Sequence, residues 1–444
     1  MPPPVDERTL YRKVARRLIP LLFVCYILAY LDRINVGFAK HQMSLDLGLS
    51  DTVYGTAAGI FFIGYLLFEV PSNLILARVG AKAWIGRIMI SWGIVAILQL
   101  LVSGPVSFFA MRFLLGVAEA GFFPGIILYL TFWFPADYRA RMVAWFMTAV
   151  ALAGVVGGPV SGWILHSMDG TAGLKGWKWL YLLEGLPSLL TGLFVLMVMD
   201  NSPAQASWLS EEEKKLLRER KVDEEARKQQ AGVTGHEVAD ALGNPKVWLL
   251  AALYFFIVMG LYGISFWLPQ IIRETITTDE QSIGWISAIP WLASAVCMVA
   301  VGGHSDRTGE RSWHIAGACL AGSIAFAACS MPEVSGWYGI LALSVATCGI
   351  MSALSCFWTL PSALLSGTAA AAGIALVNSV GNVAGYVSPE MAGMVRDATG
   401  HRMDIVLLVF AASLLVAALL TLKATRLIET TPSTASSPAS GFGR

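Results

Sequence analysis

Apolar stretches of roughly 20 residues recur along the whole chain, and this recurrence limits the folds that it can adopt. A helix of about 20 apolar residues crosses the hydrocarbon of a bilayer, whereas a soluble core has no use for many such runs. The chain has 444 residues, of which 56% are hydrophobic and 14% charged, against about 25% charged in soluble domains. The pattern therefore predicts an all-α membrane protein.

We predict 12 transmembrane helices in two bundles of six. Lys and Arg concentrate before the first span, after the last and in every second loop, which places both termini in the cytoplasm. The predicted spans are approximately 18–39, 53–76, 83–103, 105–128, 142–166, 178–200, 246–271, 281–303, 313–331, 336–357, 362–388 and 403–423. The predicted domains are an N-terminal bundle at 1–200, a cytoplasmic linker at 201–245, a C-terminal bundle at 246–425 and a disordered tail at 426–444.

The linker carries a long charged run, WLSEEEKKLLRERKVDEEARKQQ (208–230). Ser210 and Glu213 are spaced as a capping box, which satisfies the first free amides of a helix. Charges of both signs follow at helical spacing. We interpret the run as a solvated connecting helix, with a partner-binding site as the alternative.

The two halves share a short loop pattern. The chain reads ARVGAK at 77–82 and DRTGER at 306–311, at matching places in the two predicted bundles. In both loops a glycine permits a tight turn and cations hold the loop at the cytoplasmic surface. Two halves of six helices with matching loops indicate a transporter built from repeats, with its solute site between them near the middle of the membrane.

Two pairs of charged residues stand out inside the predicted spans of the first half. Asp32 and Arg33 are adjacent in the first span, and Arg112 and Glu119 share the fourth. A charge at the centre of a bilayer costs about 2.5–3.5 kcal/mol even on insertion scales, and such residues usually mark the path of an ion or solute. Neighbours on a helix diverge by about 100°, so Asp32 and Arg33 do not fully neutralise each other. Arg112 and Glu119 are two turns apart and share a face, about 10.5 Å apart along the axis.

The spans of the second half offer polar and aromatic side chains rather than charges. Asn378 and Asn382 are four residues apart and share a helix face. Buried amides need hydrogen-bond partners, which the hydroxyl or carboxylate groups of a solute would provide. The candidate solute-binding side chains from both halves are Tyr30, Tyr65, Ser355, Phe357, Trp358, Asn378 and Asn382. Glu69 and Glu184 also lie in spans, and we interpret them as structural residues that cap a helix or pair with a loop cation.

Several functional classes are disfavoured. The net charge of +1 gives no reason to expect a nucleic-acid partner. The six cysteines all lie in apolar spans without the spacing of metal ligands, so we expect no metal. We find no Walker loop, no HExxH and no GxSxG motif, and we expect neither an enzyme nor a bound cofactor.

Five segments resemble a known family. GGHSDRTGERS (302–312) resembles the cytoplasmic loop signature of the major facilitator superfamily. Segments of the first half and the linker resemble its anion:cation symporter branch, which includes bacterial permeases for tartrate, phthalate, hydroxyphenylacetate and sugar acids, and sialin. They are YLDRINVGFA (30–39), GYLLFEVPSNLIL (64–76), RFLLGVAEAGFFPG (112–125) and NSPAQASWLSEEEK (201–214).

The resemblance implies roles for individual residues. It implies proton coupling by Asp32 and Glu119, tuning of Glu119 by Arg112, and binding of a substrate carboxylate by Arg33. It places further substrate contacts near Trp358 and Asn378, and it implies a monomer. The residues that it implies for gating are Asp306, Arg307, Gly309 and Arg311.

We therefore expect a transporter in the bacterial inner (plasma) membrane that imports a small organic anion by proton symport. Its substrate would be a carboxylate such as tartrate, a sugar acid or an aromatic acid, and protons would be the coupling ion. One alternative is a proton-coupled efflux antiporter, since Gly154, Gly157, Gly158, Pro159 and Gly162 partly resemble an antiporter motif; we interpret these glycines as helix packing. The other alternative is a membrane sensor that transports nothing.

Overall fold

The computed structural model describes residues 6–230, 242–364 and 369–429, and every element described is a helix. The first half contains α1 (Glu7–Leu47), α2 (Asp51–Val79), α3 (Ala81–Leu98), α4 (Pro105–Glu119), α5 (Phe122–Trp133), α6 (Ala136–Ser167) and α7 (Gly176–Val198). The second half contains α10 (Pro245–Thr275), α11 (Glu280–Thr308), α12 (Ser312–Cys329), α13 (Trp337–Phe357), α14 (Thr359–Leu364), α15 (Ala369–Ala398) and α16 (Met403–Glu429). The helix α8 (Glu211–Gln230) and three short 3-10 helices, η1 (Gln99–Leu101), η2 (Thr171–Gly173) and η3 (Pro203–Gln205), complete the described elements.

Eleven spans within the described residues are long and apolar enough to cross a membrane. The remaining predicted span, 362–388, falls mainly on α15, which is not among them, and residues 365–368 lie outside the described part. Asn378, Asn382 and several glycines make α15 less apolar than its neighbours. The all-α, multi-pass class is confirmed, whereas the count of 12 and the cytoplasmic termini stay predictions.

The turn between α1 and α2 is closed by local chemistry. Asp6 begins α1 by accepting a hydrogen bond from the Thr9 amide at 3.1 Å, and Gly48 ends it in the left-handed region at φ +64°. The Ser50 hydroxyl then accepts from the Val53 amide at 3.2 Å and begins α2. A glycine stop followed by a serine cap reverses the chain within a few residues.

The predicted span at 105–128 lies within one apolar span, Pro105–Trp133, but the helix breaks inside it. α4 ends at Glu119, Ala120 is extended (ψ 132°), and α5 begins at Phe122. Gly121 lies between them at φ +82°, and a Cβ atom built on it would be only 2.3 Å from the Ser72 hydroxyl. The close approach of α2 therefore requires glycine there, and the break leaves Glu119 as the last residue of α4.

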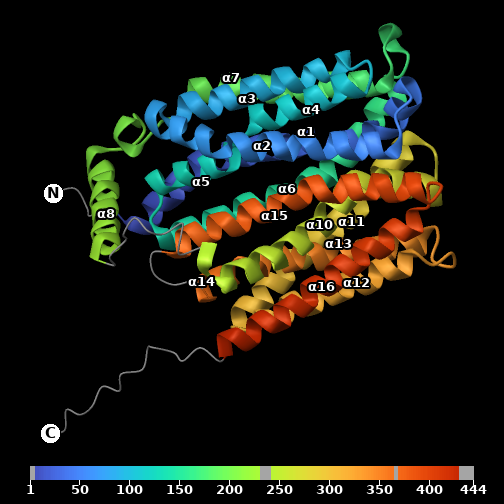
Figure 1. Cartoon of the computed structure of the whole chain (residues 1–444). Helices are drawn as coiled ribbons and strands as arrows, with labels where there is room; N and C mark the ends of the chain where they lie inside the picture. The colour runs from blue at the N-terminus through green and yellow to red at the C-terminus, as the bar shows by residue number, and fades with distance from the viewer. Residues whose placement is uncertain (1–5, 231–241, 365–368, 430–444) are drawn as a thin grey trace.

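The linker helix is attached to the start of α1. The predicted capping box is confirmed: the Ser210 amide donates to Glu213 at 2.8 Å, and the Glu213 amide donates to the Ser210 hydroxyl at 3.2 Å. Glu213 also pairs with Lys13 at 2.7 Å, and Arg220 pairs with Glu7. Figure 1 shows α8 across one end of the molecule, where α1 begins and α16 ends. We call this the α8 end.

Among the described residues, the main contacts between the two halves come from three helix pairs. α2 packs on α15, α6 on α11, and α1 on α10, and Figure 1 shows α6 and α15 running through the middle of the molecule. The backbones come closest toward the end opposite α8. A Cβ atom on Gly158 would lie 2.4 Å from the carbonyl oxygen of Gly284, and one on Gly55 would lie 2.2 Å from that of Pro389.

The packing interpretation of the α6 glycines is thus confirmed, and it yields a prediction. Gly158→Leu should prevent α6 and α11 from meeting, because the new side chain would collide with the α11 backbone. We expect transport by reconstituted protein to fall by at least about 100-fold. Gly317→Leu on α12 is the control, since a Cβ atom there meets nothing within 4 Å. Full transport by the Gly158 variant would contradict the requirement for close packing.

Candidate functional site

Arg33 lies where the two halves meet. Its guanidinium makes an ion pair with Glu119 of α4, and its Nη1 donates to the hydroxyl of Tyr262 on α10 at 3.2 Å. The side chain of Glu119 is 1% exposed, whereas that of Arg33 is 11% exposed. A buried cation is thus shared between a carboxylate of the first half and a phenol of the second.

Aromatic rings surround this ion pair. The centre of the Arg33 guanidinium lies 5.1 Å from the ring of Phe61, 5.8 Å from Phe62, 5.6 Å from Tyr65 and 6.0 Å from Tyr30. The faces of these rings attract the cation, and this cation–π attraction becomes stronger where water is excluded. The sequence predicted Tyr30 and Tyr65 as site residues, but it gave no reason to single out Phe61 and Phe62 among many span phenylalanines.

Tyr30 connects the cluster to the second half. Its hydroxyl lies 3.3 Å from that of Ser265 on α10, and its ring meets Trp291 of α11 edge-on, with centroids 6.4 Å apart. Sequence reasoning missed Tyr262, Ser265 and Trp291. Polar or aromatic residues are common in such helices, and only packing reveals which of them face α1.

Asp32 points away from its neighbour Arg33. One of its oxygens accepts from the indole N–H of Trp92 on α3 at 2.7 Å and from the hydroxyl of Ser188 on α7 at 2.5 Å. Its side chain is fully buried inside the first half. The structure therefore divides the predicted charges into two groups: Arg33 and Glu119 between the halves, and Asp32 within the first half.

Arg112 is fully buried on α4 and does not pair with Glu119 directly. It donates to the carbonyl oxygen of Ala58 on α2 at 3.4 Å, and its guanidinium lies 5.3 Å from the Phe61 ring. Phe61 thus lies between the two arginines. Arg112 also acts on Glu119 through electrostatics without occupying its oxygens.

The predicted residues of the second half lie around Tyr254 of α10. Phe357 stacks on this ring with centroids 4.9 Å apart, and Trp358 meets it at the same distance with the rings tilted by 60°. Tyr254 also covers Gly381 of α15.

The predicted asparagines flank that glycine. Asn378 and Asn382 lie on either side of Gly381 along α15, and both are partly exposed, as is Ser355, whose hydroxyl donates to the Ser352 carbonyl at 2.8 Å. Tyr254 is within electrostatic reach of Tyr30. Of the predicted second-half residues, Phe357 and Trp358 are thus the ones that pack on Tyr254.

The predicted gating loop joins α11 to α12 at the α8 end. Gly309 ends α11 at φ +70°, Arg311 pairs with Asp306 at 2.6 Å, and Arg307 is exposed. Burial would raise the pKa of Glu310, but the Trp313 amide and the His314 ring donate to its carboxylate and hold that pKa below its ordinary value. These contacts order the loop within the second half.

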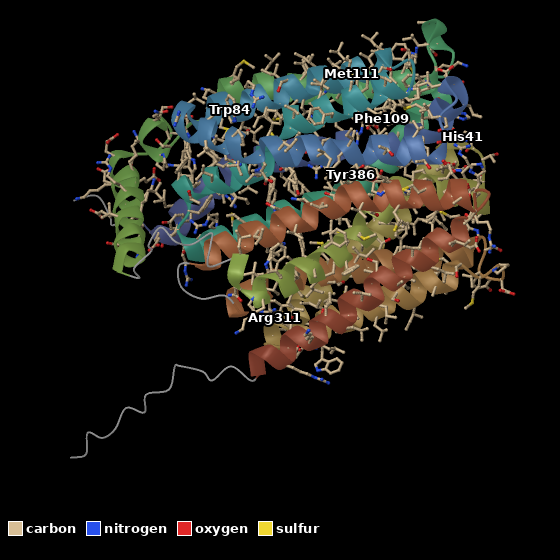
Figure 2. All side chains as sticks on the ribbon, in the orientation of Figure 1. His41, Trp84, Phe109, Met111, Arg311 and Tyr386 are labelled. Atoms are coloured by element: carbon tan, nitrogen blue, oxygen red, sulfur yellow. The ribbon has the colours of Figure 1, made fainter. Side chains whose placement is uncertain are left out.

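Sequence reasoning missed an ionic lattice that closes the end opposite α8, where His41 lies in Figure 2. Asp51 of α2 pairs with Lys40 of α1 at 2.6 Å, with Arg396 of α15 at 2.8 Å and with His401 at 2.8 Å. Arg396 also pairs with Glu274 of α10 at 2.7 Å. Lys40, Asp51 and Arg396 are each less than 9% exposed. Charges of both halves thus neutralise each other across the interface.

Removing one member of this lattice should open that end. Arg396→Ala would remove the cation that joins Asp51 to Glu274 and leave Asp51 with Lys40 and His401, and breaking a buried ion pair costs about 3–5 kcal/mol. We expect the population to shift by more than about 100-fold toward molecules in which the halves are apart there. Spin labels at the exposed positions Leu45 and Thr278 should report longer distances.

The matched control is Arg402→Ala, which removes an exposed pair with Asp404 inside the second half. Exposed pairs contribute about 0–1 kcal/mol, so the label distances should not change. Unchanged distances in the Arg396 variant would show that the lattice does not hold the halves together.

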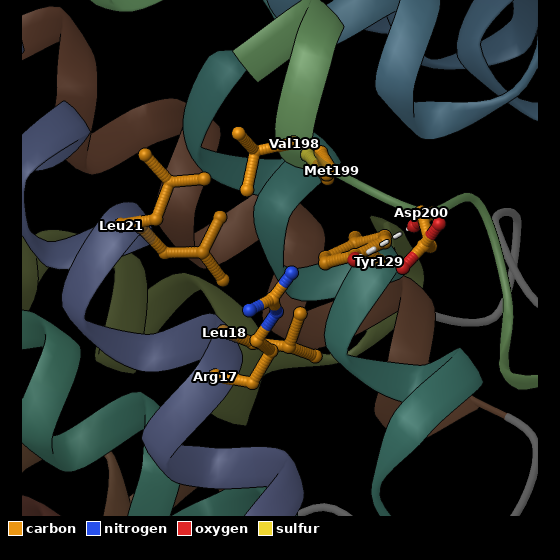
Figure 3. A pocket seen from close by; sticks show the side chains of 8 residues that line it. Arg17, Leu18, Leu21, Tyr129, Val198, Met199 and Asp200 are labelled. Carbon is orange, nitrogen blue, oxygen red and sulfur yellow. Dashed lines mark hydrogen bonds between the residues drawn. The ribbon is translucent and has the colours of Figure 1, made fainter. Parts of the chain in front are cut away.

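A small pocket near the α8 end is excluded as the solute site. It is lined by Arg17, Leu18, Tyr129 and Asp200 among others, and its free volume is about 10 Å³ (Figure 3). That volume holds about one water molecule, whereas small-molecule sites are usually about 300–1,000 Å³. The Tyr129 hydroxyl donates to the Asp200 carbonyl at 2.8 Å, so the residues there serve the junction of α5 with the linker.

Two helical halves, multiple apolar spans and a buried ion pair at their interface define a multi-pass membrane transporter. Residues 22–389 match the sequence pattern of the Major Facilitator Superfamily, and the chain belongs to this superfamily. The resemblance seen in the sequence is thereby confirmed.

Individual relatives are similar over nearly the whole chain. A protein of Agrobacterium vitis named "Putative tartrate transporter" is 47% identical over 94% of this chain and 91% of its own length. A "Quinolone resistance transporter" of Acinetobacter baumannii is 40% identical over 89% of this chain and 90% of its own. The crystal structure of a bacterial homologue of the human lysosomal transporter Spinster, inward-facing and unoccupied, is similar in fold alone. Its TM-score is 0.76 at 16% identity, with 94% of this chain and 98% of that one covered.

Proposed function

We propose that the protein imports a small carboxylate together with protons across the bacterial inner membrane. The observation that carries the proposal is the ion pair of Arg33 and Glu119, buried among aromatic rings between the two halves. Arginine binds carboxylates through two parallel N–H donors, and Glu119 occupies that position in the unloaded state.

Protonation of Glu119 is the coupling step. A neutral Glu119 no longer neutralises Arg33, and an uncompensated buried guanidinium is unfavourable. A substrate carboxylate can then take the place of the Glu119 carboxylate on the same guanidinium. Substrate therefore binds more tightly when Glu119 is protonated than when it is ionised. Proton binding and substrate binding are thereby thermodynamically linked.

Movement between the two open states follows from loading. The ionic lattice around Asp51 and Arg396 holds the end opposite α8 closed, and we assign that end to the periplasm and the α8 end to the cytoplasm. The loaded site carries paired or neutral groups only, which lowers the electrostatic cost of rearranging the halves around it. Asp32 supplies a further proton-binding carboxyl inside the first half.

The neighbouring groups favour a carboxylate that also carries hydroxyl groups or a ring. The hydroxyl of Tyr262 and the amides of Asn378 and Asn382 provide hydrogen bonds, and Trp358 provides an aromatic face. Tartrate is the first candidate, because a relative at 47% identity carries that name. Sugar acids and aromatic acids are the next.

Reconstituted vesicles test the proposal directly. Purified protein should accumulate a labelled carboxylate when the outside is acidic, and the uptake should stop when an ionophore collapses the proton gradient. A panel of tartrate, a sugar acid and an aromatic acid identifies the preferred class. Uptake that ignores the gradient would refute proton symport, and the absence of any solute flux would favour a sensor.

Efflux is a second candidate, because a relative at 40% identity is named for quinolone resistance. Quinolones themselves carry a carboxylate, so the Arg33 site would serve either cargo. In symport the solute moves in the same direction as the protons, whereas in efflux by antiport it moves in the opposite direction. Drug loss from vesicles in exchange for entering protons, without carboxylate accumulation, would support efflux.

A further inference from the structure

A second buried carboxyl lies inside the first half, and the function proposed above leaves it unused. Glu184 on α7 is 5% exposed, and one of its oxygens accepts from the Ser161 hydroxyl of α6 at 2.7 Å. The interpretation of Glu184 as a partner of a loop cation is therefore wrong. Its electrostatic neighbours include Asp32 and the Asn35 amide, both on α1.

Asp32 and Glu184 share one pattern of hydrogen bonding. One oxygen of each carboxyl accepts from hydroxyl or indole donors: Trp92 and Ser188 for Asp32, and Ser161 for Glu184. The other oxygen of each is buried without a partner among the described residues. Both side-chain atoms of Asn35, which is 1% exposed, are also unpartnered there.

The charges around this cluster do not balance two carboxylates. Within the described parts of the chain, neither Asp32 nor Glu184 makes an ion pair. Glu119 and Arg112 of α4 both act on Asp32, and Arg112 also acts on Tyr181 of α7, the other titratable group that acts with Glu184. Two ionised carboxyls held in low dielectric would repel each other and lose their hydration. A proton on the free oxygen of either relieves both costs.

We propose that Glu184 and Asp32 form a proton-binding site in the first half, separate from the pair of Glu119 and Arg33, and that Glu184 carries one of the coupled protons. The inference rests on the proton-coupled function proposed above and adds a residue to it. A proton needs a single free oxygen. A metal cation needs several oxygens at once, and the free oxygens of Asp32, Glu184 and Asn35 are the ones that it would use, so the experiment compares proton with sodium gradients.

The dependence of accumulation on the pH gradient tests this site. At zero membrane potential the logarithm of the accumulation ratio rises with the pH difference in proportion to the number of coupled protons, about tenfold per proton and pH unit. Glu184→Gln should lower this slope by one proton, so that accumulation at a difference of one unit falls about tenfold. Exchange of substrate across the membrane without a gradient should continue, because exchange needs no net proton movement. Glu184→Asp should keep the slope.

The outcomes distinguish failure of the proposed Glu184 site from failure of the proposed proton symport. A wild-type slope of zero refutes proton symport and the inference with it. A wild-type slope that Glu184→Gln leaves unchanged refutes the inference alone. Uptake that follows a sodium gradient but not a potassium gradient would show that the coupling ion is a metal cation, and it would also refute the inference. If Glu184→Gln does not fold, the variant Ser161→Ala tests the proposal instead. Loss of the Ser161 hydrogen bond should shift one carboxylic-acid C=O band in infrared difference spectra. The absence of any shift would overturn the proposal.

Discussion

Replacing Arg33 by alanine should abolish substrate binding. The variant removes the only guanidinium that the described structure places against Glu119 between the halves. Truncating one partner of a buried, hydrogen-bonded charge pair costs about 2–5 kcal/mol, so affinity for the carboxylate should fall by at least about 100-fold. Isothermal titration of purified protein with the best substrate of the panel measures this loss.

Arg33→Lys separates charge from geometry. Lysine keeps the positive charge but lacks the planar fork that holds two oxygens, so binding should be only partly restored. Arg87→Ala is the matched control, since Arg87 stacks on Trp84 at 3.9 Å, away from the cluster around Arg33. Normal affinity in Arg33→Ala would remove the basis for a carboxylate substrate.

Glu119→Gln should uncouple substrate movement from protons. Glutamine has the size of protonated glutamate and leaves Arg33 permanently without its carboxylate partner. Substrate exchange should therefore continue, whereas the accumulation ratio under an acid-outside gradient of one pH unit should fall about tenfold, which is the contribution of the proton that Glu119 carries. A gradient of one pH unit supplies about 1.4 kcal/mol per proton, so the coupled wild-type protein should reach about tenfold per proton.

The control for this experiment is Glu219→Gln, which removes an exposed carboxylate from the linker helix α8 and should accumulate substrate normally. Accumulation by Glu119→Gln equal to that of the wild type would show that Glu119 carries no coupled proton. Loss of exchange together with accumulation would point instead to a structural role for the ion pair.

The sequence predicted the parts of the site that depend on the cost of burying charge. Arg33 and Glu119 are conspicuous in the sequence, because charged side chains are rare within membrane spans and usually have a function there. Their contact joins residues 86 positions apart and depends on the break at Ala120 and Gly121, which brings the end of α4 beside α1. The break was not predicted, since an alanine and a glycine also occur inside continuous membrane helices.

Neighbouring residues with opposite charges invite the view that they act together, and here that view fails. Asp32 turns toward Trp92 and Ser188, and it acts electrostatically on Glu184, more than a hundred positions later. Serine and tryptophan are frequent in membrane helices, so their part in this cluster was not visible before the helices were packed. The same holds for Asp51 and Arg396, which lie near span ends and look like ordinary surface charges in the sequence.

The amino-acid sequence by itself determined the class of this protein and the residues whose charge must be explained. Hydropathy acts locally, through the transfer of each apolar run from water to lipid, and so it can be read one segment at a time. Only the tertiary structure decided which charges meet, because pairing depends on helix rotation, breaks and the closeness that glycine allows. Arg33 with Glu119, Asp32 with Glu184, and Asp51 with Arg396 are results of packing, since each pair joins helices that are separate in the chain.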